Sequence, residues 1–68
     1  MLINRIAAYE NKNLVLEGIM VEADSNKALK KFEEKYPTYK NCIVKATQID
    51  TEEHKEYIEM CMKLGCIY

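Results

Sequence analysis

The sequence has little of what marks a catalytic centre, a metal site or a membrane segment. It contains one histidine, two glycines, one proline and no tryptophan in 68 residues. Its longest uninterrupted apolar run, Ile6 to Tyr9, is far shorter than the ~20 residues that a membrane-spanning helix needs. The two glycines are isolated, so no glycine-rich loop that could cradle a phosphate group is indicated.

The cysteines and the histidine do not have the spacing of a reactive or metal-binding group. Cys42, Cys61 and Cys66 are an odd number in a chain without a secretory leader, which favours free thiols in a reducing cytoplasm. Structural zinc sites have closer cysteine pairs than Cys61 and Cys66. On a helix, His54 would lie two turns from Cys61, roughly 10 Å along the axis, too far to share a proton or a metal. We therefore expect no metal, no cofactor and no catalytic residue.

The length suits one small domain with a thin core, which we place at residues 1–68. Near this length a domain buries only ~60% of the surface that its unfolded chain exposes. Apolar residues make up 49% and charged residues 31% of the chain, a balance typical of a folded domain. Small domains without disulfides or metals often gain support from a second chain. A homodimer is therefore expected to form through an edge strand or through the end that carries Cys61, Met62, Ile67 and Tyr68.

The first third of the chain predicts a β-hairpin. Residues 2–9 and 14–23 are rich in β-forming residues and flank a polar stretch of turn-forming composition, Glu10 to Asn13. In the second segment the apolar residues change parity at Gly18. A β-bulge at Gly18 would keep both sets on one face, whereas a strand covered on both faces would need no bulge.

The remaining pattern predicts a helix, a strand and a second helix. Asp24-Ser25 is typical of a helix N-cap, and apolar residues recur at helical spacing as far as Tyr36-Pro37, where proline ends the helix. Residues 39–49 return to β composition. Asp50 and Glu53 have the spacing of a capping box. Behind them an apolar stripe ends at Gly65, a suitable C-cap, and this stripe comprises Tyr57, Ile58, Cys61, Met62 and Leu64.

The element order β-β-α-β-α predicts the α+β class, with a small three-stranded sheet and two helices packed on one face. The strand order stays open, and a parallel pairing of the second and third strands through the first helix is one alternative. A sheet of three strands has two edges. Either edge could recruit a strand from a partner or from a second copy of the chain.

The net charge is −1, but the charges are unevenly distributed. Residues 25–49 hold six lysines and two glutamates, whereas residues 50–68 hold two lysines and five acidic residues. Helical spacing gathers part of these charges into a basic patch on the first helix and an acidic face on the second. Both could simply be solvated, as most charge runs are. The basic patch comprises Lys27, Lys30 and Lys31, and the acidic face comprises Glu52, Glu56 and Glu59.

These features together favour a non-catalytic protein-interaction, inhibitor or regulatory module with an unidentified protein partner. Tyr39 and Tyr68, near the ends of elements, join the charged residues as candidates for its recognition surface. Short length and a composition rich in Asn, Lys, Ile and Glu favour an origin in a phage or a mobile element. The alternative is a nucleic-acid-binding module, which overall acidity and scarce arginine disfavour. Its phosphate contacts would be Lys27, Lys30, Lys31 and Lys35.

Overall fold

The computed structural model describes residues 2–68 and shows three strands and two α-helices in the order β-β-α-β-α. The α+β class and the element order predicted from the sequence are confirmed. A short 3₁₀ helix, Pro37–Tyr39, follows the first α-helix. The strands are β1 (Leu2–Glu10), β2 (Asn13–Glu22) and β3 (Ile43–Gln48), and the helices are α1 (Ser25–Lys35) and α2 (Lys55–Leu64).

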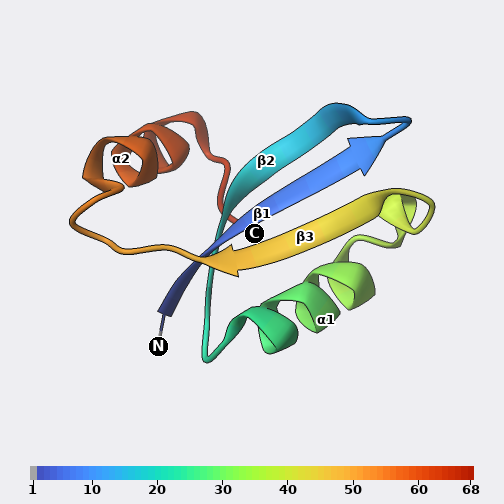
Figure 1. Ribbon diagram of the computed structural model, residues 1–68, viewed down its shortest axis with the longest axis horizontal. Coiled ribbons are helices and arrows are strands. Elements are labelled where there is room, and N and C mark those ends of the chain that lie inside the picture. The colour runs from blue at the N-terminus through green and yellow to red at the C-terminus, as the bar shows by residue number, and fades with distance from the viewer. Residues whose placement is uncertain (1) are drawn as a thin grey trace.

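The strand order is β2-β1-β3, and both pairings are antiparallel (Figure 1). β1 is therefore the central strand, and the parallel pairing considered for β2 and β3 does not occur. α1 carries the chain from β2 past β1 to the position where β3 pairs. The strand order determines which edges of the sheet are open.

A two-residue turn at Asn11 and Lys12 closes the hairpin between β1 and β2. Both residues have positive φ, 51° and 69°, as the central residues of a type I′ turn do. This turn type matches the right-handed twist of paired strands, which is why short hairpins use it. The predicted hairpin is confirmed, and its strands begin and end within one residue of the predicted bounds.

The bulge in β2 lies at Val15 and not at Gly18. The pairing between β1 and β2 shifts between Ala8 and Tyr9, which leaves Val15 as the extra residue. Gly18 pairs regularly with Ile6. The glycine therefore has a different role from the one that the parity change suggested.

The helices cover opposite faces of the sheet, which corrects the prediction that both pack on one face. Residues paired across a ladder share a face, and successive residues of a strand point to opposite faces. Ile6, the partner of Gly18, shares a buried cluster with Phe32 of α1. Ile19, the next residue of β2, shares a second buried cluster with Cys61 of α2. Figure 1 accordingly shows α1 and α2 on opposite sides of the strands. β2 is therefore covered on both faces at Ile19 and Met20.

Residues 66–68 run along the outer edge of β2 and join the two layers. The N–H of Ile19 donates to the carbonyl of Cys66 at 3.0 Å, and the N–H of Tyr68 donates to the carbonyl of Ile19 at 2.8 Å. A Cβ at Gly18 would overlap both the Tyr68 ring and the Cys66 carbonyl oxygen. Glycine is needed at position 18 because another part of the chain occupies the space of a side chain.

α1 begins and ends as the sequence predicts. The Asp24 carboxylate accepts the N–H of Lys27 at 2.8 Å and caps the first turn, and Pro37 lies just after the last residue. Because Pro37 starts a 3₁₀ helix that includes Tyr39, the third strand is shorter than predicted and begins at Ile43.

α2 begins later than the capping-box spacing predicts. The Asp50 carboxylate accepts the N–H groups of Glu52 and Glu53, at 2.8 and 3.1 Å, and so caps a separate turn that precedes the helix. The helix itself begins at Lys55. Its end agrees with the prediction, because Gly65 has a φ of 77° and serves as the left-handed C-cap.

Replacement of Gly18 by alanine tests the packing of residues 66–68. We expect Gly18→Ala to lower the free energy of unfolding by about 1–3 kcal/mol in urea titrations, because the new methyl group must displace Tyr68 or bend β2. Near-UV circular dichroism should lose part of its tyrosine signal. As a control, Gly65→Ala should cost about 1 kcal/mol through backbone strain and keep that signal. A Gly18→Ala protein as stable as the wild type would contradict this packing.

Candidate interaction surface

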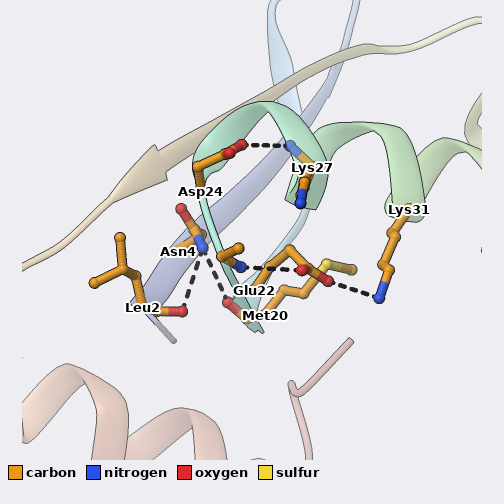
Figure 2. Close-up of polar contacts among 8 residues, drawn as sticks. Leu2, Asn4, Met20, Glu22, Asp24, Lys27 and Lys31 are labelled. Atoms are coloured by element: carbon orange, nitrogen blue, oxygen red, sulfur yellow. Dashed lines mark hydrogen bonds and ion pairs between the residues drawn. The ribbon is translucent and has the colours of Figure 1, made fainter.

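The three lysines of the predicted basic patch are exposed on α1, but one of them is engaged. Lys31 Nζ lies 2.8 Å from the carboxylate of Glu22, whose side chain is only 6% exposed (Figure 2). The other carboxylate oxygen of Glu22 accepts the N–H of Ala23 at 2.9 Å. A buried carboxylate needs such partners to remain ionised. Lys27 and Lys30, by contrast, form no ion pair within residues 2–68.

The Glu22 pair belongs to a polar cluster at the junction of β2 and α1. The hydrogen bond from Lys31 holds the pKa of the Glu22 carboxyl below its ordinary value, and the N–H of Ala23 adds to the effect. The same pairing raises the pKa of Lys31. Figure 2 shows Asn4 in this cluster, where its buried amide donates to the carbonyls of Leu2 and Met20 at 3.4 and 3.5 Å. The cluster therefore joins β1, β2 and α1.

The predicted acidic face is divided between two elements. Glu52 lies in the turn before α2, whereas Glu56 and Glu59 lie on the helix. All three side chains are exposed. Because α2 begins only at Lys55, the structure places two of the three carboxylates on one helix and leaves the third in the turn capped by Asp50.

The two tyrosines proposed for recognition pack into an aromatic cluster around Phe32. The ring centroids of Tyr39 and Tyr68 lie 5.9 and 5.8 Å from that of Phe32, which is fully buried. The Tyr68 hydroxyl donates to the Glu17 carbonyl at 3.3 Å, and burial raises the Tyr68 pKa. Both rings are half-buried and contribute to the core on the α1 face.

The end proposed for homodimer contacts is only partly a surface. Cys61 is 4% exposed, and Tyr68 belongs to the aromatic cluster. Met62 and Ile67 remain 61% and 48% exposed. The four residues therefore do not form one exposed patch.

A surface that the sequence analysis missed lies on the face opposite α1, at the hairpin end of the sheet. α2 packs on this face around Ile3, Ile19 and Ile49. Farther along, Tyr9 pairs with Leu14 on one side and with Ile43 on the other, so the three side chains form a row across the sheet. Leu14 is 48% and Ile43 is 67% exposed. Exposed apolar side chains gathered in this way often mark an interaction site.

Two lysines flank this row and make its surroundings positive. Lys45 Nζ lies 5.8 Å from the centroid of the Tyr9 ring, within cation–π range. A shallow pocket of about 290 Å³ is lined by Tyr9, Lys12, Ile43 and Lys45, and by no acidic residue. We name the residues Tyr9, Lys12, Leu14, Ile43 and Lys45 the hairpin-end surface.

The outer edge of β3 borders the hairpin-end surface, and no strand within residues 2–68 pairs with it. The N–H of Ile49 donates to the carbonyl of Ile3 at 3.0 Å. Because bonded and unbonded positions alternate in an antiparallel ladder, the N–H of Lys45 also points toward β1. The backbone groups of Val44 and Ala46 therefore point outward, and within residues 2–68 no backbone hydrogen bond reaches them. β3 is thus a free edge, while residues 66–68 cover part of the β2 edge.

The residues considered for chemistry lie on separate elements. Cys61 is buried in the core of the α2 face, Cys42 lies just before β3, and His54 precedes α2 with its Nδ1 3.0 Å from the Asp50 carbonyl. In residues 2–68 no three His, Cys, Asp or Glu side chains gather as a metal site. Over the same residues, no helix has the length and apolar character to cross a membrane.

Comparison of the chain with protein-family profiles, curated proteins and solved structures finds no match. Its own fold defines it as an α+β protein with a three-stranded antiparallel sheet, one helix on each face and a free edge at β3.

The Glu22–Lys31 pair predicts a pH dependence of stability. The pKa of Glu22 is lower in the folded state than in the unfolded state. The ionised carboxylate therefore stabilises the fold fully above the unfolded-state pKa of about 4.3, and this stabilisation is lost as the pH falls through the folded-state pKa. Between about pH 5 and pH 3, the free energy of unfolding should therefore fall more steeply in the wild type than in Glu22→Gln.

Denaturant titrations at several pH values measure these slopes. Glu33→Gln, which removes an exposed carboxylate of α1, should keep the wild-type slope. Equal slopes for the wild type and Glu22→Gln would contradict the assigned pairing.

Proposed function

We propose that this protein is a protein-interaction module that binds an extended segment of a partner protein along the free edge of β3. One observation carries the proposal: the unpaired edge of β3 borders an exposed apolar and basic surface that includes Ile43 and Lys45. In strand addition, main-chain hydrogen bonds supply affinity and alternate side chains supply specificity. β3 offers both.

The side chains beside the edge indicate the chemistry of the partner. Residues opposite each other in neighbouring strands have Cβ atoms about 4.5–5.5 Å apart. An apolar residue opposite Ile43 would cover a side chain that is 67% exposed, and an Asp or Glu opposite Lys45 would form an ion pair. The expected segment therefore carries an apolar residue and a carboxylate two positions apart, both facing the hairpin-end surface.

The same lysine disfavours pairing of β3 with β3 of a second copy. In the antiparallel register that pairs Lys45 with its own copy, the two-fold axis brings the two Lys45 side chains together, and opposed like charges destabilise a sheet. Lysine on an edge strand is a common device against edge-to-edge association. The β3 edge should therefore prefer an acidic strand to its own copy.

The nucleic-acid alternative has weaker support. Lys31 is engaged with Glu22, and Lys35 Nζ lies 5.6 Å from the centroid of the Tyr36 ring. Lys27 and Lys30 are the members of the patch without such a contact. This alternative would replace strand addition if oligonucleotide binding were lost in Lys27→Ala/Lys30→Ala and unchanged in Lys45→Glu. The test leaves Lys31 in place, because its removal would leave a buried carboxylate unpaired.

Peptide binding tests the proposal directly. The probe is a set of eight-residue fluorescent peptides in which Val lies two positions from Glu, Ser or Lys, so that both side chains share one face of the strand, with Thr at the other positions. Binding is followed by anisotropy. The Glu peptides should bind best and should weaken with rising salt. Ile43→Asp and Lys45→Glu should each reduce affinity by about tenfold or more. Lys27→Glu, the same charge reversal on α1, should change it less than about twofold.

Backbone methylation of the peptide separates strand pairing from charge attraction. N-methyl groups on the alternate residues that face β3 remove donors and should abolish binding, whereas methylation of the intervening residues should be tolerated far better. Binding that survives methylation of the inward-facing positions, or that ignores Lys45→Glu, would refute strand addition at β3.

A further inference from the structure

α2 carries exposed apolar residues that the core does not use. Tyr57 and Ile58 pack on the sheet with Cys61, the only buried residue of this helix. Met60 and Leu64 remain 50% and 70% exposed. These two residues are four positions apart, so they lie one above the other on a single stripe of the helix.

Two opposite charges flank this stripe at the two ends of the helix. Glu56 lies in the first turn and Lys63 in the last. At about 100° per residue, seven positions bring them within about 20° of each other around the axis, on the side next to Met60. Within residues 2–68 neither side chain forms an ion pair.

We propose that α2 pairs antiparallel with α2 of a second copy of this chain. Glu56 and Lys63 are equally far from the midpoint between positions 59 and 60. A two-fold axis at this midpoint therefore places Glu56 of each copy opposite Lys63 of the other and forms two identical ion pairs. Met60 and Leu64 of both copies fill the space between the two helices.

The positions of Glu56 and Lys63 favour a second copy of α2 in this orientation. A parallel arrangement would oppose Glu56 to Glu56 and Lys63 to Lys63, whereas the antiparallel one satisfies both residues with the same surface of the second copy. It also places the positive end of each helix dipole beside the negative end of the other. α2 has only ten residues and one buried side chain, so contact with a second helix would stabilise it.

A pair of charge reversals tests this arrangement with a built-in rescue. Sedimentation velocity from about 5 µM to about 500 µM should show the wild type shift from monomer to dimer. Glu56→Lys and Lys63→Glu each turn both contacts into like-charge pairs, and each should weaken association by about tenfold or more. An equimolar mixture of the two variants should recover it as a heterodimer, because both contacts then join a lysine to a glutamate.

Lys55→Glu provides the matched control, since it reverses a charge on the side of α2 away from Met60 and should leave association unchanged. Circular dichroism checks that every variant is folded. A wild type that stays monomeric over the whole range, single variants that dimerise normally, or a mixture of folded variants that fails to associate would each overturn the proposal. None of these measurements involves a peptide, so the result is independent of strand addition at β3.

Discussion

The pairing of residues 66–68 with the outer edge of β2 is the contact on which the rest of the structure depends. Both backbone groups of Ile19 bond to this segment. Its N–H donates to the carbonyl of Cys66, and its carbonyl accepts the N–H of Tyr68. Because the Tyr68 ring then enters the cluster around Phe32, the segment connects the α2 layer to the α1 layer. It also covers part of the β2 edge, so that β3 is left as the edge open to a partner.

The local features of the fold were predictable because each depends on neighbours in the sequence. Asp24 caps α1, Pro37 follows its end, and Gly65 ends α2 as their chemistry requires. The reason for Gly18 was not predictable, because the ring that excludes a side chain there belongs to a residue far along the chain. The parity change in β2 was visible, but its meaning depended on which face of the sheet α2 covers.

The candidate surface was harder to predict, because exposure is a property of the assembled fold. Lys31 looked equivalent to its neighbours until the structure placed the Glu22 carboxylate beside it. In the sequence, Ile43 and Lys45 are simply part of the segment 39–49 that has β composition. Their importance follows from the order β2-β1-β3, which puts them on an edge strand, and from the limited reach of α2, which leaves that end of the face open.

Amide hydrogen exchange of the dilute, unbound protein tests the contrast between the two edges most directly. The N–H groups of Ile19 and Tyr68 should be protected to nearly the same extent as that of Lys45, which points toward β1. The N–H groups of Val44 and Ala46 should exchange far faster, because they face away from the sheet. Equal protection of Val44, Ala46 and Lys45, or rapid exchange of Tyr68, would contradict a sheet closed at β2 and open at β3.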